Sequence, residues 1–154
     1  MNKIFLSILF FPALAIATEM TDAVQDVAAS KMTTLATIYD QEAQVVYVGQ
    51  DSSCESVSII WPRNSIENFR VCNGEVLPRH TVSPAIDEET IRPILKSVIG
   101  NAIMYGQAKQ KDSAGYLISV RALSDVSSDC KNIEVIVSYD GDLVDRKLQK
   151  ICGR

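Results

Sequence analysis

The fold of this chain is decided by a stretch from Cys54 to Cys72, which reads CESVSIIWPRNSIENFRVC. Two runs rich in β-branched and aromatic residues flank the turn-forming letters PRNS at 62–65, and this pattern predicts a β-hairpin. If Trp61 pairs with Ile66 across the turn, the two cysteines lie almost opposite each other at the open end of the hairpin. We therefore expect a disulfide between them.

The C-terminal cysteines follow the same rule. Asp140-Gly141 is a strong hairpin signal, and folding the chain about it brings Cys130 almost opposite Cys152. Four cysteines allow three pairings, and this register favours one disulfide within each hairpin. Metal binding is the alternative use of four cysteines. It is disfavoured because the chain has no C-x-x-C spacing and a single histidine.

The first seventeen residues have the three parts of a secretory signal peptide. Lys3 gives a positive start, an uncharged run follows, and Ala15-Ile16-Ala17 is a small-x-small cleavage site. We expect residues 1–17 to be removed and residues 18–154 to form a single domain that is periplasmic or secreted. An uncleaved anchor is the alternative, but a span needs about 20 apolar residues and this run is shorter.

Hydrophobic periodicity predicts the remaining elements. Helices are expected at 18–41, where the end is rich in β-branched residues and the helix could stop sooner, and at 90–109. Strands are expected at 43–48, 54–61, 66–72, 75–82, 116–123 and 133–139, and 143–152 fits a strand or a short helix.

The predicted fold class is therefore α+β. One antiparallel sheet, a meander plus a C-terminal hairpin, carries two amphipathic helices and two hairpin disulfides. The first helix either covers the sheet or projects as a docking arm. The sequence shows no internal repeat.

Composition excludes several classes of protein. The chain has 154 residues, 47% of them hydrophobic and 22% charged, which is typical of a globular domain. Its 15 basic residues against 19 acidic ones give a net charge of −4, which argues against a nucleic-acid partner. After the leader we expect no integral membrane segment.

Binding surfaces are often built from tryptophan and arginine. Trp61 is the single tryptophan, and Arg63, Phe69 and Arg70 lie near it in the sequence. These four residues are the candidate binding surface. The competing interpretation of Trp61 is an indole that closes the end of the core.

The candidates for chemistry are weaker. His80 could act as a general base with help from Glu75 and Arg79, although no complete catalytic arrangement is visible. Asp140, Asp142 and Asp145 cluster at the C-terminal turn and could hold Ca²⁺, but they supply too few oxygen ligands. We expect no metal and no cofactor. Nucleophile-elbow, zinc-protease and phosphate-loop motifs are absent.

These patterns favour a non-enzymatic, exported binding or assembly protein. It would serve as an accessory subunit of a bacterial envelope secretion, conjugation or surface-structure machine, with a protein partner in the envelope and self-association as a further option. Two alternatives stay open: a secreted toxin or effector enzyme that uses His80, and a periplasmic enzyme inhibitor or immunity protein.

Overall fold

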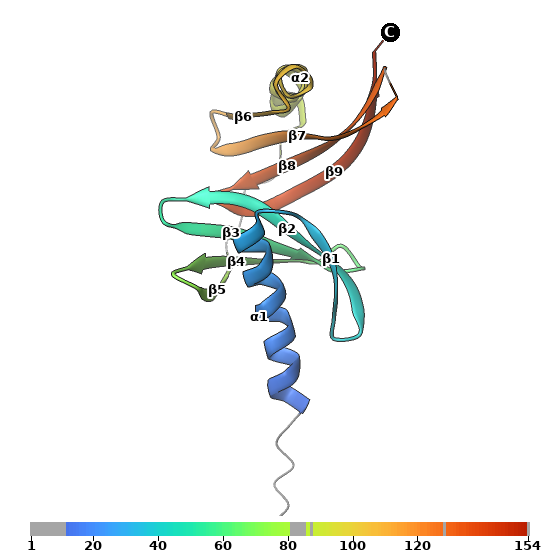
Figure 1. The fold of residues 1–154 in the computed structure, drawn as a ribbon. Helices are drawn as coiled ribbons and strands as arrows, with labels where there is room; N and C mark the ends of the chain where they lie inside the picture. Colours follow the sequence, from blue (N-terminus) through green and yellow to red (C-terminus); the bar gives the residue numbers. More distant parts are fainter. Residues whose placement is uncertain (1–11, 81–85, 87, 128, 154) are drawn as a thin grey trace, which may run out of the picture.

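The chain folds into two units of similar order, each a helix followed by an antiparallel meander (Figure 1). The computed structural model describes residues 12–80, 86, 88–127 and 129–153. The first unit consists of α1 (Pro12–Ser30), β1 (Thr34–Ile38), β2 (Gln41–Asp51), β3 (Cys54–Ile60), β4 (Ile66–Cys72) and β5 (Glu75–Arg79). The second unit consists of α2 (Glu88–Tyr105), β6 (Gln107–Lys111), β7 (Tyr116–Ser127), β8 (Cys130–Tyr139) and β9 (Asp142–Cys152).

Each unit forms its own sheet, and the two sheets lie face to face between the two helices (Figure 1). The first sheet has the order β1-β2-β3-β4-β5, and the second has the order β6-β7-β8-β9. Every strand therefore pairs with its neighbour in sequence. The layers are α1, first sheet, second sheet and α2.

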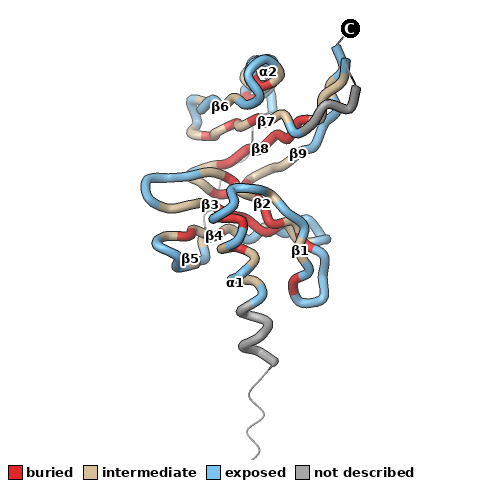
Figure 2. Tube along the Cα trace, in the orientation of Figure 1, coloured by how far each residue is buried: buried red, intermediate tan, exposed pale blue. Residues whose placement is uncertain are grey.

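Three apolar clusters lie between these layers, and buried residues gather along the strands that line them (Figure 2). Val24, Val27 and Ala28 of α1 share one cluster with the first sheet. Ile91, Val98 and Ala102 of α2 share another with the second sheet. Their spacings of three, four and seven residues place each set on one face of its helix. The third cluster lies between the sheets and joins Val46, Val48, Ile136 and Leu143.

The structure confirms the α+β class and both predicted disulfides, Cys54–Cys72 and Cys130–Cys152. Each cysteine pair lies directly opposite in its hairpin register. In the first hairpin the pairing starts at Ile60 and Ile66, one residue earlier than expected, and this brings the cysteines into line. In the second, Tyr139 pairs with Asp142 as predicted, and a register shift in β9 next to Ser138 absorbs the one-residue offset.

The two units also correspond in detail. In both, the disulfide closes the open end of the hairpin formed by the third and fourth strands. In both units the second strand carries a β-bulge. The bulge lies opposite two residues of the third strand, the second and the third after the first cysteine of the unit. Those residues are Ser56 and Val57 in β3, and Asn132 and Ile133 in β8. No internal repeat was found in the sequence, so only the three-dimensional arrangement reveals this correspondence.

Both helices end before the last residue predicted for them, and for the first helix an earlier end was one of the expectations. The first helix stops at Ser30 and not at Gln41, and Thr34–Ile38 forms β1, in keeping with its β-branched residues. The second helix stops at Tyr105, where Gly106 has a φ of 84° and its N–H bonds to the Ala102 carbonyl at 2.8 Å. The following polar residues form the edge strand β6.

Further differences concern the sheets and the chain segments between them. Two sheets replace the single predicted one, and the segment at 142–152 is a strand rather than a helix. The strand expected at 75–82 ends at Arg79. The last two residues of that predicted strand, 81 and 82, lie outside the described residues.

Helix α1 covers the first sheet, which is the first of the two predicted alternatives. Its packed side chains are Met20, Ala23, Val24, Val27 and Ala28. Of the predicted signal peptide, residues 1–11 lie outside the described residues, and α1 begins at Pro12. Cleavage after Ala17 would keep all of these packed side chains. None of the described helices is long and apolar enough to cross a membrane.

Two hairpin turns share one backbone conformation but differ in their surroundings. Asn73-Gly74 and Asp140-Gly141 have φ values of 51° and 81°, and of 50° and 84°, as type I′ turns require. A Cβ on Gly141 would lie 2.9 Å from the Ser56 Oγ on the first sheet, whereas a Cβ on Gly74 would meet nothing within 4 Å. The second turn therefore needs glycine for two reasons.

We predict that Gly141→Ala destabilises the protein by about 1–3 kcal/mol more than Gly74→Ala, because only the former combines backbone strain with overpacking between the sheets. Equilibrium urea unfolding of both variants measures the difference. Equal losses would contradict the contact between this turn and the first sheet.

The two disulfides close loops of similar length, with sequence separations of 18 and 22. Chain entropy then predicts that each double Cys→Ala replacement lowers the free energy of unfolding by about 3 kcal/mol. Denaturant unfolding of Cys54→Ala/Cys72→Ala beside Cys130→Ala/Cys152→Ala tests this. A loss confined to one pair would show that chain entropy does not govern their contribution.

Candidate binding cleft between the sheets

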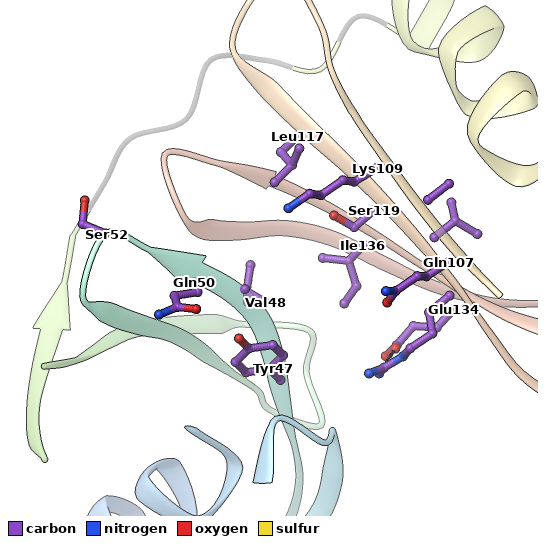
Figure 3. A pocket seen from close by; sticks show the side chains of 14 residues that line it. Tyr47, Val48, Gln50, Ser52, Gln107, Lys109, Leu117, Ser119, Glu134 and Ile136 are labelled. Carbon is purple, nitrogen blue, oxygen red and sulfur yellow. Dashed lines mark hydrogen bonds and ion pairs between the residues drawn. The ribbon is translucent and has the colours of Figure 1, made fainter. Parts of the chain in front are cut away.

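A cleft of about 740 Å³ lies between the two sheets (Figure 3). One wall is the end of β2 with the turn that follows it, from Tyr47 to Ser52. The other wall is the inner face of the second sheet, where β6, β7 and β8 contribute side chains. The residues of the second sheet that line the cleft are Gln107, Ala108, Lys109, Leu117, Ser119, Val120, Arg121, Glu134 and Ile136.

Strand alternation explains which side chains reach the cleft. In β7, Ile118 and Val120 belong to the core under α2, although Val120 also borders the cleft, and Leu117, Ser119 and Arg121 project from the opposite face. In β8, Ile133 and Val135 belong to the same core, and Glu134 and Ile136 line the cleft. The polar face of the second sheet therefore points at the first sheet.

Glu134 is the central polar group of this wall. Its side chain is only 1% exposed, and its two carboxylate oxygens accept from two different arginines. Arg121 donates to Oε2 from within the second sheet, and Arg146 donates to Oε1 at 2.7 Å. Arg146 also donates from Nη1 to the Gln44 Oε1 at 2.6 Å, and Gln44 belongs to the first sheet. The buried carboxylate thus helps to fix one sheet against the other.

Sequence reasoning missed Glu134. The available signal was a single charged residue inside an apolar strand, flanked by Ile133 and Val135. A carboxylate at such a position must be paired when it is buried. Its partners Arg121 and Arg146 could not be assigned from the sequence, since they lie on two neighbouring strands.

Tyr47 borders the cleft on the opposite wall, and its side chain packs against the core under α1. Its hydroxyl donates to the Glu55 Oε2 at 2.6 Å, and Glu55 also pairs with Lys31 at 3.2 Å. Burial, and then the hydrogen bond to the Glu55 carboxylate together with its negative charge, raise the pKa of Tyr47 well above its ordinary value. The phenol is therefore neutral throughout the physiological range, and the charged groups that line the cleft are Lys109, Arg121 and Glu134.

A second polar contact joins the sheets at the C-terminal turn. Arg79 of β5 donates from Nη1 to the Asp140 carbonyl at 2.8 Å and pairs with the Asp140 carboxylate at 3.0 Å. It also lies 3.4 Å from the buried Asp142 carboxylate. The Leu143 N–H donates to the Asn68 Oδ1 at 3.0 Å. This turn is therefore docked on the first sheet.

The aspartates predicted as a weak cation site do not converge. Asp140 and Asp142 face Arg79, whereas Asp145 pairs with Lys147 at 3.2 Å. Among the described residues there is no group of three or more side chains that could hold a metal ion. The positive charge next to Asp140 and Asp142 is therefore the Arg79 guanidinium, at the place where Ca²⁺ was considered.

The four residues of the predicted binding surface do not form one surface. Trp61 is half-buried against the core under α1 and stacks on Tyr39 with ring centroids 6.0 Å apart. Phe69 is 5% exposed in that same core. Arg63 is exposed in the β3–β4 turn, while Arg70 projects from the other face of β4 and pairs with Asp51.

His80 is exposed directly after β5 and does not line the cleft. Its proposed helpers are dispersed: Glu75 lies at the far end of β5, and Arg79 is engaged with Asp140 and Asp142.

We predict that Glu134→Gln lowers the free energy of unfolding by about 3–5 kcal/mol, because it leaves two guanidinium groups facing a neutral amide in a buried site. Asp145→Asn is the matched control. It removes an exposed pair and should cost at most about 1 kcal/mol. Chemical denaturation of both variants measures the contrast, and a small loss for Glu134→Gln would show that the buried carboxylate does not stabilise the contact between the sheets.

Comparison of the chain with protein-family models, with curated proteins and with solved structures finds no match.

Proposed function

We propose that this chain is an exported, non-enzymatic binding protein and that the cleft between its two sheets is the partner site. The cleft itself carries the proposal. Its volume of about 740 Å³ falls within the range of about 300–1,000 Å³ that is usual for ligand sites. The bonds that Arg146 and Arg79 make across the sheets hold its walls in place, which reduces the entropic cost of binding.

The lining chemistry favours binding over catalysis. A general base needs a free acceptor next to the substrate. The carboxylate that lines the cleft, Glu134, is occupied by Arg121 and Arg146, and the Tyr47 hydroxyl is bonded to Glu55. His80 is not part of the lining. These observations give little support to the alternative of a secreted effector enzyme.

The cysteines support an exported location. Two disulfides are compatible with an oxidising compartment, as the predicted leader requires. We propose that the protein works in the bacterial envelope, as an accessory subunit of a secretion, conjugation or surface-structure machine. Its partner would be an envelope protein. Self-association, and a role as an enzyme inhibitor or immunity protein, stay as predictions.

The test is affinity capture of the tagged mature protein from its native envelope after mild cross-linking. Ser119 points into the cleft (Figure 3), so Ser119→Trp should fill it. Thr37→Trp adds the same ring at an exposed position on β1, outside the lining. We expect a stoichiometric envelope partner with the parent and with Thr37→Trp, and at least about tenfold less of it with Ser119→Trp.

Unfolding curves must first show that both tryptophan variants are folded. Equal recovery of the partner with Ser119→Trp would contradict the assignment of the cleft. A one-to-one complex with a soluble enzyme would favour the inhibitor role over the assembly role.

A further inference from the structure

We infer that the cleft recognises an acidic, extended segment of a protein partner, laid along β6 with carboxylates at alternate positions. This inference rests on the proposed function and specifies its ligand. It is carried by two independent observations, the charge of the cleft and the open edge of the strand beside it.

The cleft is positively charged in a protein that is negative as a whole. Lys109 and Arg121 line it beside one carboxylate, Glu134, and Arg146, outside the lining, also pairs with that carboxylate. The whole chain has a net charge of −4. Charge complementarity therefore favours an anionic ligand here and repels it elsewhere on the molecule.

The cations have bonding capacity left. The Arg121 side chain is 37% exposed and uses Nη2 for Glu134, although a guanidinium has five N–H donors. Lys109 is exposed and enters no ion pair in the part of the chain that the structure describes. Both side chains can thus meet carboxylates without breaking a contact within the protein.

The neighbouring strand favours a peptide. β6 pairs with β7 on one side and is the edge of its sheet on the other. An extended peptide can bond to such an edge through its backbone. The first sheet has two edge strands: β1, whose residues do not line the cleft, and β5, which contains Pro78 and so lacks one N–H. β6 contains no proline.

Side-chain spacing sets the pattern of the ligand. Gln107, Lys109 and Lys111 alternate along β6 and project from its cleft side, because Ala108 packs towards α2. In a peptide strand that pairs with β6, every second side chain lies on the same face as Gln107, Lys109 and Lys111. Carboxylates at alternate positions would then face the two lysines, and the amides of Gln50 and Gln107 can bond to backbone groups.

Other anions fit less well. Single-stranded nucleic acids bind on aromatic platforms that stack with the bases. Tyr47 is the one aromatic residue in the lining described for the cleft, and its hydroxyl is bonded to Glu55. A peptide needs no such platform.

The experiment uses the mature protein and three synthetic probes in isothermal titration calorimetry. The first probe is a capped heptapeptide with glutamate at positions two, four and six and threonine elsewhere. The second replaces each glutamate with glutamine, and the third is a short single-stranded oligonucleotide. We expect the acidic peptide to bind at least about tenfold more tightly than either of the others, and to weaken as salt is raised.

Protein variants locate the site. Lys109→Glu should weaken binding of the acidic peptide by at least about tenfold, whereas Lys96→Glu should leave it unchanged. Lys96 is exposed on α2, outside the cleft lining, and its replacement alters the net charge by the same amount. Equal affinity for the acidic and glutamine peptides would overturn the inference. Equal effects of the two lysine replacements, or tighter binding of the oligonucleotide, would do so as well.

The two proposals can fail separately. If Ser119→Trp abolishes capture of the envelope partner and Lys109→Glu does not, the cleft binds a partner but not through acidic side chains. If neither variant affects capture, both proposals are wrong.

Discussion

The buried carboxylate of Glu134 positions Arg146, whose guanidinium bonds across to Gln44 of the first sheet and helps to set how the two halves of this protein meet. The apolar core described between the sheets consists of four buried side chains, Val46, Val48, Ile136 and Leu143. Hydrophobic contact is not directional and would tolerate several orientations of one sheet on the other. The hydrogen bonds that Glu134 and Gln44 accept from Arg146 are directional and restrict that orientation.

The cleft is a consequence of where these contacts lie. β9 contacts β3 and β4, and its leading turn bonds to Arg79 on β5. The sheets therefore meet along β9, at one edge of the second sheet, while β6 forms the opposite edge. The inner faces of β6 and β7 do not press against the first sheet, and the polar side chains of their alternating pattern remain accessible.

Local chemistry made much of the fold predictable. The turn at 62–65 and Asp140-Gly141 each specify a hairpin within a few residues, and the hairpin register then places the cysteines. The apolar face of α2 is likewise recognisable from one short stretch of sequence. β1 was missed because its turn, Tyr39-Asp40, takes positive φ values without a glycine to mark it. β6 was missed because a polar strand at a sheet edge has no hydrophobic alternation.

The division into two sheets and the cleft depend on contacts between distant residues. The sequence predicts that a helix follows the meander, but nothing near Arg79 indicates that the strands after this helix form a second sheet. The predicted binding residues were selected for their type, and strand alternation then placed Phe69 in the core and Arg70 on the opposite face. The cleft residues Gln50, Lys109 and Glu134 are individually unremarkable in sequence and meet only because two sheets converge.

Each unit is stabilised largely by its own contacts, and this independence is what allows the contact between them to be polar. Each helix shares a core with its own sheet, and each hairpin is closed by its own disulfide. The interface between the sheets is therefore not required to hold either sheet together. Charged and amide side chains with directional bonds keep the sheets aligned, and part of the space between the sheets is open. The same residues, Glu134 and its two arginines, thus serve both the stability of the fold and the charge of the cleft.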